Sequence, residues 1–513
     1  VVAAFGRTLL RLLFCRGRRF RGELTGLIFP ICTRDLDGDH GADLLTAMLR
    51  HGGHLPVGIA VQSVRPRSSD IRCGVKGDKD ILDVSYSGEV DLPFEFFVKF
   101  NLPSLSPMRL LVETTQVCRC EALFYHHVAA KVAHFIQTPK SYFVDFNRTS
   151  GEFALLSEVV HFGKNGLLPL KHRIRNAPIV EEQLLFLSKG ARLNATLFGE
   201  RHPDLACVLR FDTTHREMWL MAQLTARMGL HHTLRKTLKG KGVNVAFMTW
   251  DPPSELVGRE SELISDMPRI LTSLCEDSGM LAFGHNDFTT DNAYFFADPD
   301  GKLSFGAFDW QQSCVNNVGQ EWAWNLHFLP PEFLSEHEPE FIAHILKTYE
   351  EFGVHIPRAR FVQAYVLGAV QMFVFGGGGL QLLLSDLNRR GIFQGLVPND
   401  PRCQGQSGFD AETLEKVVGA EMTRRTFTNC CNIMRRHDFV RHWDRWKQAG
   451  GKLVWEDAAP TSSASGRKAW QQPLDAQELS TPPTAGAIED QRLVRARALR
   501  VRKRTLLVKH LQC

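Results

Sequence analysis

The sequence has no CxxC repeat and no histidine at zinc-finger spacing, although it contains 12 cysteines. The closest cysteine pairs are Cys118 with Cys120 and Cys430 with Cys431. These spacings fit neither a structural zinc site nor the disulfide framework of a small secreted domain. We therefore expect reduced thiols in a cytoplasmic type of compartment.

Long uncharged runs are also scarce. The exception is Phe361–Ser385, which is long enough to cross a bilayer but carries three glutamines and four consecutive glycines, Gly376–Gly379. This composition favours a buried helix followed by a glycine loop over a membrane span.

Acidic residues are missing from both ends of the chain. Residues 1–22 contain six arginines, and residues 491–513 contain eight lysines and arginines, within a formal net charge of +5. The body between them carries about −9, which argues against a nucleic-acid-binding core. The N-terminal segment is either an organelle-targeting segment or a disordered extension. The C-terminal segment is either a helix that contacts an anionic surface or a solvated tail.

The apolar pattern predicts an α+β fold of two lobes. Residues 41–160 form a small β-rich lobe with strands in 54–64, 81–88 and 94–100, a helix over 120–136 and a connecting strand in 151–163. Residues 161–455 form a mainly helical lobe, interrupted by a hairpin over 293–310 that turns at Asp298–Gly301. Residues 1–40 are an extension, and residues 456–513 are a disordered linker followed by the basic tail.

Polar side chains with a definite spacing lie in the stretch from Leu281 to Gln312. Asp287 and Asn292 have the D-x4-N spacing of a kinase catalytic loop, and Asp309 ends the second strand of the predicted hairpin. Phosphoryl transfer needs a carboxylate that accepts the proton of the attacking hydroxyl, together with oxygen ligands for Mg²⁺. The alternative is that these residues only cap turns and the next helix.

Such a site also needs a cation for the nucleotide phosphates, held by a carboxylate from a helix. Lys99 lies inside the apolar strand "FFVKF", and Glu121 follows near the start of a predicted helix. We expect the two to pair, because an unpaired ammonium group is costly inside an apolar strand. The alternative is that Lys99 lies on an edge strand and reaches water.

In this order the motifs resemble the choline-kinase and aminoglycoside-phosphotransferase branch of the protein-kinase-like superfamily. The closest resemblance is to the CHK-kinase-like group, which includes ecdysteroid-kinase-like proteins. The matching segments extend over about residues 55–350. They are "LPFEFFVKF", "CEALFYHHVAAKV", "TPKSYFVDF", "FALLSEVV", "GARLNATLF", "GHNDFTTDNAYFF", "FDWQ" and "GQEWAWNLHFLPPEFL".

The resemblance implies a protein-kinase-like fold with ATP bound between the lobes. Lys99 would bind the ATP phosphates with Glu121 as its partner. The adenine would bind the backbone of the connector, from Glu158 to Val160.

The resemblance also implies a phosphotransferase that acts on a hydroxyl of a small molecule. Asp287 would be the base that deprotonates this acceptor. Asn292 and Asp309 would bind Mg²⁺, and His285, next to the base, would brace the catalytic loop more than take part in the chemistry.

Several departures from the family leave other functions open. Asn286 stands where the family usually has Gly, and Asn194 stands where many relatives have His. A glycine-rich phosphate loop is not recognisable, and its only candidate is residues 68–80 with Gly74 and Gly77. These departures motivate the alternative of a catalytically silent pseudokinase that binds nucleotide or ligand. An atypical protein kinase is a weaker alternative, because the sequence has neither DFG at Asp309 nor an APE-like segment after it.

Overall fold

The computed structural model divides by contacts into two units, Val1–Ala458 and Ala459–Cys513. The structure describes residues 2–15, 18–67, 78–102, 107–162, 170–171, 178–199, 202, 205–227, 251–289, 292–375, 391–392, 397–398 and 411–455, all in the first unit. The candidate glycine loop before residue 78, the glycines 376–379, the linker and the basic tail therefore lie outside the described residues. The nine cysteines of the described ranges are free thiols.

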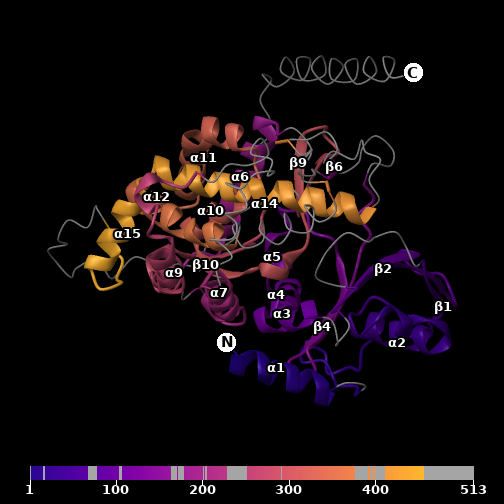
Figure 1. The fold of residues 1–513 in the computed structure, drawn as a ribbon. Coiled ribbons are helices and arrows are strands. Elements are labelled where there is room, and N and C mark those ends of the chain that lie inside the picture. Colours follow the sequence, from indigo (N-terminus) through magenta and orange to yellow (C-terminus); the bar gives the residue numbers. More distant parts are fainter. Residues whose placement is uncertain are drawn as a thin grey trace, which may run out of the picture. The chain divides into compact units, whose positions relative to one another are not determined.

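A five-stranded antiparallel sheet forms the small lobe, in the order β1-β2-β3-β5-β4 (Figure 1). Its strands are β1 Val61–Pro66, β2 Asp78–Tyr86, β3 Glu95–Phe100, β4 Ser141–Asn147 and β5 Glu152–Ser157. The predicted strands are present with shifted ends. β1 begins later than predicted, after a turn that contains Gly58 at φ 94°, and the connecting strand, predicted over 151–163, ends at Ser157. β4 is a strand that the sequence pattern missed, because its five central residues are all buried and do not alternate.

Helices cover both faces of this sheet. Helix α2 (Gly38–His51), which follows the short helix η1 (Thr33–Leu36), packs on one face. Helices α3 (Pro107–Thr115) and α4 (Val117–Leu123) pack on the other. The side chains of strand β5 alternate between the two faces of the sheet. Ala154 and Leu156 face α2, while Phe153 and Leu155 face α4.

The predicted helix over 120–136 begins earlier, at Val117, ends earlier, at Val132, and changes type along its length. A π-helical segment, η2 (Phe124–Val128), follows α4 and is followed by α5 (Ala129–Val132). Helix α1 (Val2–Cys15), at the start of the sequence, packs against α3.

The large lobe is mainly helical, as predicted, and its described residues share a large hydrophobic core. Its helices are α6 Val180–Thr196, α7 Phe211–Arg227, α9 Glu260–Cys275, α10 Val318–Asn325, α11 Pro331–Glu351, α12 Arg358–Gly368, α14 Ala411–Arg436 and α15 Phe439–Gln448, with short 3₁₀ helices η4 Ser254–Leu256, η5 Ser278–Met280 and η7 Trp310–Gln312.

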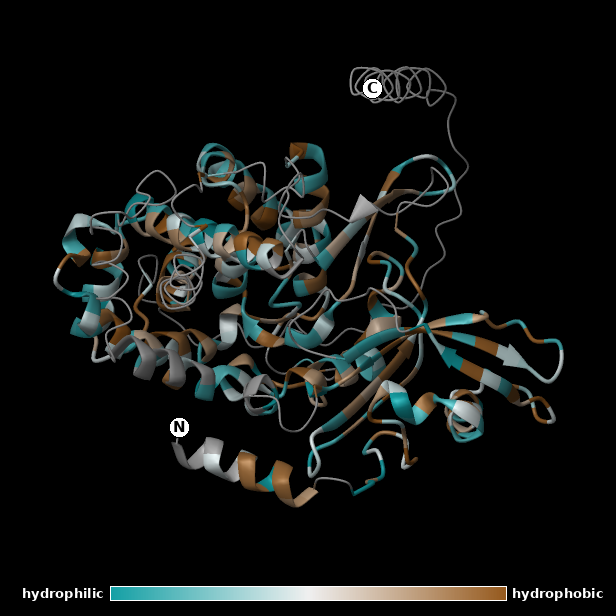
Figure 2. Ribbon diagram, turned by 45° about the vertical axis from the view of Figure 1, so that its right-hand side comes forward, coloured by the Kyte–Doolittle hydropathy of each residue, from teal (hydrophilic) through white to brown (hydrophobic). Residues whose placement is uncertain are grey.

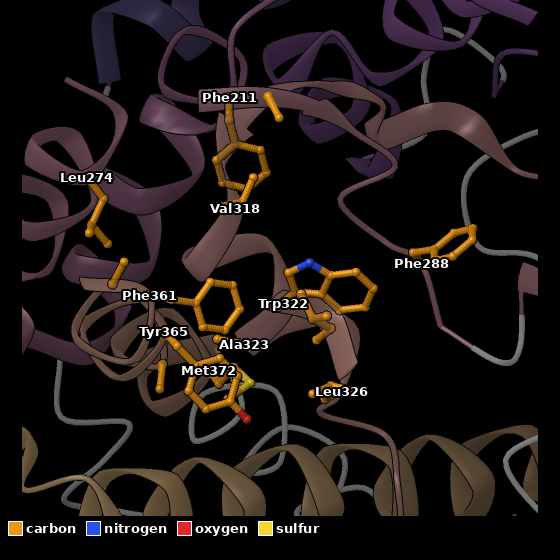
Figure 3. Packing of buried hydrophobic residues seen from close by; sticks show 14 of the residues in the cluster. Phe211, Leu274, Phe288, Val318, Trp322, Ala323, Leu326, Phe361, Tyr365 and Met372 are labelled. Atoms are coloured by element: carbon orange, nitrogen blue, oxygen red, sulfur yellow. The ribbon is translucent and has the colours of Figure 1, made fainter. Parts of the chain in front are cut away.

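The uncharged run that begins at Phe361 is a buried helix, as predicted. Figure 3 shows Phe361, Tyr365 and Met372 packed beside Trp322 and Ala323 of α10. None of the helices in the described ranges combines the length and the apolar content needed to cross a membrane.

In the part of the large lobe that the structure describes, five short strands carry the loops. Strand β7 (Leu281–Gly284) pairs with β10 (Cys314–Asn317), and β8 (Ala293–Ala297) pairs with β9 (Leu303–Ala307) and with β6 (Leu170–Lys171). The predicted hairpin is confirmed, and its turn has Gly301 at φ 77° with the Gly301 N–H donating 2.8 Å to the Asp298 carbonyl. A small β-rich lobe and a large helical lobe together make the two-lobed α+β fold that the sequence predicts.

Candidate active site

Strand register explains why Lys99 points into the protein. Lys99 lies opposite Leu155 of β5, and Leu155 belongs to the cluster that faces α4. The neighbours of Lys99 in the strand, Val98 and Phe100, point to the other face, toward α2. Because β3 lies between β2 and β5, Lys99 is not on an edge strand, and its side chain is only 3% exposed.

Lys99 joins two carboxylates that come from different lobes. Its Nζ lies 2.8 Å from Oε2 of Glu121 and 2.7 Å from Oδ1 of Asp309. Burial lowers the pKa of Lys99, but the charges of Asp309 and Glu121 outweigh burial and leave this pKa raised. The ammonium group is therefore charged at neutral pH. The predicted pair of Lys99 and Glu121 is present, and Asp309 joins it.

Asp287 lies in the loop that connects β7 to β8, where two side chains orient its carboxylate. The indole N–H of Trp324 donates to Oδ1 over 3.2 Å, and Nδ2 of Asn292 lies 3.3 Å from Oδ2. The same Nδ2 also donates 2.8 Å to the Asp287 carbonyl. Asp287 is partly exposed, whereas the residues on both sides of it are buried. The carboxylate is thus fixed in direction and still accessible.

Asn292 and Asp309 both lie at the open end of the β8–β9 hairpin. Ala293 is paired with Ala307, so the residues just beyond them lie opposite each other. The Phe308 N–H accordingly donates 3.1 Å to the Asn292 carbonyl. The side chain of Asp309 is 31% exposed and offers carboxylate oxygen at this end.

These oxygen donors suit Mg²⁺, which is usually held by one or two protein side chains together with phosphates and water. Within the ranges that the structure describes, no group of three or more His, Cys, Asp or Glu side chains could hold a metal by itself. The two predicted ligands would therefore act together with oxygens of the nucleotide.

His285 holds the loop between β7 and β8 against the segment that precedes Asp309. Its Nε2 lies 3.1 Å from the Phe308 carbonyl, and its ring centroid lies 4.5 Å from that of Trp310. The side chain is fully buried, and burial lowers the pKa of His285, so a neutral imidazole donates to the carbonyl. These contacts are those of a brace between two parts of the site.

Asn286 has a backbone conformation that few residues adopt. Its φ is 55°, in the left-handed region that asparagine tolerates better than most residues. The side chain adds hydrogen bonds that a glycine could not make. Nδ2 donates 3.0 Å to the Cys314 carbonyl, and Oδ1 accepts from Nδ2 of Asn316 over 2.8 Å. The Asn286 side chain thus ties the loop between β7 and β8 to β10.

The connector follows β5, and its backbone is oriented by Lys140. The Glu158 N–H donates 2.8 Å to the Lys140 carbonyl, and the Lys140 N–H donates 3.2 Å to Oε2 of Glu158. Val160 is partly buried. Adenine binding along Glu158–Val160 stays a prediction.

Helix α10 supplies three residues to the site that the sequence reasoning did not assign. Oε1 of Glu321 accepts from the Asn286 N–H over 3.2 Å, and Oδ1 of Asn325 accepts from the Phe288 N–H over 2.9 Å. Trp324 is the third, through its bond to Asp287. Their spacing of i, i+3 and i+4 in "GQEWAWN" was the available signal, because these positions share one helix face.

Glu321 is the centre of a buried polar network. Its Oε2 accepts from Nδ2 of Asn194 over 2.9 Å, and Oδ1 of Asn194 accepts from the Tyr349 hydroxyl over 3.0 Å. Burial raises the pKa of Glu321 to about 7, against the opposing effect of these donors. Asn194 is therefore part of the support of the loop between β7 and β8.

The segment after Asp309 enters the core at once. Trp310 is fully buried and stacks on Phe124, with ring centroids 3.7 Å apart. Helix η7 leads directly into β10, and all residues from Trp310 to Gln320 are buried. This stretch has no room for the exposed activation segment of a protein kinase.

Comparisons with known proteins give structural likenesses only. The chain matches no protein-family model and no curated protein sequence. Similar solved structures include an ethanolamine kinase from Plasmodium vivax, with 13% identity, a TM-score of 0.39 and coverage of 80% of this chain and 100% of the other. A choline/ethanolamine kinase family protein from Mesorhizobium loti has 12% identity and a TM-score of 0.37, with coverage of 80% of this chain and 99% of the other. A putative aminoglycoside phosphotransferase from Ralstonia eutropha has 13% identity and a TM-score of 0.33, with coverage of 76% of this chain and 97% of the other. At this level of similarity the function rests on the side chains of the site itself.

Proposed function

We propose that this chain is a Mg²⁺-dependent phosphotransferase that moves the γ-phosphoryl group of ATP to a hydroxyl of a small molecule. The observation that supports it best is the contact of Lys99 with both Glu121 and Asp309. It brings together residues from β3, α4 and the end of β9, which are up to 210 positions apart in the chain.

The first step in the proposal is binding of the nucleotide. Lys99 would bind phosphate oxygens, and Glu121 would keep the ammonium group in place. Asn292 and Asp309 would hold Mg²⁺, whose charge offsets the charge that develops on the phosphates. Since Lys99 and Asp309 are in contact here, phosphates that reach Lys99 also come within the range of Asp309.

The second step is activation of the acceptor. Asp287 would accept the hydroxyl proton as the oxygen attacks the γ-phosphorus. Trp324 and Asn292 occupy one oxygen each of the carboxylate and so restrict its rotation. This restriction favours catalysis, because positioning contributes much of the rate in phosphoryl transfer.

A compact organic acceptor suits the surroundings of Asp287. His327 packs between Trp324 and Phe328, with ring centroids 4.3 Å and 3.7 Å away. Burial lowers the pKa of His327 to about 4, so this group of rings carries no charge at neutral pH. Trp324 and Phe328 are partly exposed and offer an apolar surface of the kind found in ligand sites.

Transfer of label from γ-labelled ATP into a metabolite extract tests the proposal. Wild type and Asp287→Asn are compared under Mg²⁺, with Asp300→Asn in the exposed hairpin turn as the matched control. We expect a labelled small molecule from wild type and from the control, and a rate about 10²–10⁴-fold lower from Asp287→Asn. Equal rates from Asp287→Asn and wild type would exclude Asp287 as the base.

Thermal denaturation with and without Mg·ATP tests the nucleotide site separately. We expect Mg·ATP to raise the melting temperature of wild type and of Asp287→Asn but not of Asp309→Asn. Mg·ATP stabilisation of wild type without labelled product would favour the catalytically silent alternative. Label on the protein itself, with none on a small molecule, would favour an atypical protein kinase.

A further inference from the structure

Helix α1 has one face fixed on the small lobe. Leu12 is buried, and Arg11 donates to Oε2 of Glu113 on α3 over 2.8 Å and to the carbonyl of Arg148. The thiol of Cys15 donates 3.3 Å to the Thr149 carbonyl at the end of the helix. These contacts set which side of α1 faces away from the protein.

The outward side of α1 is apolar. Leu9, Leu10, Leu13 and Phe14 are 45%, 55%, 47% and 73% exposed. They occupy positions i, i+1, i+4 and i+5, which share one side of a helix. Figure 2 shows hydrophobic residues along the last turns of α1. The other large apolar residues that are exposed in the described ranges occur singly along the sequence, so this group of four is a distinct patch.

Positive charge follows this patch along the chain. Residues 1–22 include six arginines and no acidic residue. Arg18, Arg19 and Arg21 follow the helix directly and are exposed, and the Arg18 N–H donates 3.1 Å to the Cys15 carbonyl, which keeps Arg18 close to the helix end. Arg19 also pairs with Asp35. An apolar side flanked by arginine is the pattern of a helix that lies in the surface of an anionic membrane.

We propose that α1 and the arginines after it form a docking surface for anionic lipid bilayers. Leu9, Leu10, Leu13 and Phe14 insert at the boundary between headgroups and acyl chains, and the guanidinium groups contact lipid phosphates. The opposite side of α1 stays on α3, so the small lobe is held at the membrane. This inference does not depend on the proposed phosphotransferase activity.

Co-sedimentation of the full chain with lipid vesicles tests the proposal. Vesicles of phosphatidylcholine with about one third phosphatidylserine are compared with vesicles of phosphatidylcholine alone. The variant is the double substitution Leu10→Asp and Phe14→Asp. The matched control is the double substitution Val57→Asp and Phe94→Asp, which adds the same charge at side chains that are 100% and 67% exposed elsewhere.

We expect wild type and control to bind the mixed vesicles equally and the α1 variant to bind at least about tenfold more weakly, with no change in melting temperature. Binding of the α1 variant equal to wild type would overturn the proposal and would place any membrane contact in the basic tail. Equal binding of wild type to neutral vesicles would also overturn it. Self-association of wild type that the α1 variant lacks, without vesicle binding, would assign the patch to a second copy of the chain instead.

Discussion

Glu321 makes the stability of the large lobe depend on pH in a way that one substitution should remove. Its carboxyl group is buried in the network that supports the catalytic loop, and burial raises its pKa from the ordinary value of 4.5 to about 7. A carboxyl group with a raised pKa binds its proton more tightly in the folded state than in the unfolded state. Its contribution to stability is therefore present below about pH 4.5 and is lost as the pH rises through about 7.

The size of this effect follows from the two pKa values. At about 1.4 kcal/mol per pH unit, the full difference corresponds to about 3 kcal/mol. About 2 to 3 kcal/mol of this should fall between about pH 5 and pH 8.5, a range in which denaturation is easily measured. Glu321→Gln cannot titrate, and the mismatch of its amide with Asn194 adds a constant cost of about 1–3 kcal/mol.

The assay is urea denaturation of wild type, Glu321→Gln and the control Glu89→Gln, which makes the same change at an exposed side chain. We expect the difference in unfolding free energy between wild type and Glu321→Gln to change by about 2 to 3 kcal/mol across this pH range, with wild type losing stability as the pH rises. The control should follow wild type in parallel. Parallel profiles for Glu321→Gln as well would refute the assignment of a raised pKa to Glu321.

Three further substitutions test other contacts. Lys99→Met leaves its carboxylate partners without a cation, and we expect the free energy of unfolding at pH 7, measured by urea denaturation, to fall by about 3–5 kcal/mol. A fall below about 1 kcal/mol would contradict the buried ion pair. Trp324→Phe keeps an aromatic ring but removes the N–H that donates to Asp287, and we expect kcat to fall about 10- to 100-fold while the melting temperature stays the same. An unchanged kcat would mean that this hydrogen bond does not orient the base. In Gly284→Ala, the new Cβ would collide with the Glu321 carboxylate. We expect circular dichroism to show an unfolded protein or a fall in the free energy of unfolding of about 3 kcal/mol or more. A variant as stable as wild type would show that the network can move aside.

The sequence was sufficient where the signal is local. Lys99 could be placed because it interrupts an apolar strand, and Glu121 because a helix follows at a fixed distance. The β8–β9 hairpin carries its own turn residues, from Asp298 to Gly301. In each case the neighbouring residues alone determine the local conformation.

The support of the catalytic loop could not be predicted in the same way. Glu321 and Asn194 are 127 positions apart and meet only after α6 and α10 pack together. Strand β10 is short, and its pairing with β7 depends on the long-range fold. β4 lacks alternation because both of its faces are buried. Contacts between distant segments determine all three features, and single-sequence patterns do not report such contacts.

The hydrogen bond from the Asn286 amide to Glu321 has a consequence for the motions of the catalytic loop. The acceptor is buried and is itself held by α6, so this amide can exchange its proton with solvent only when the helices separate. Its exchange rate should then follow global unfolding, although active-site loops usually open more easily than the rest of a protein. On heating, the backbone at Asn286 would keep its geometry until the large lobe melts, so that the proposed activity and the fold would be lost at the same temperature.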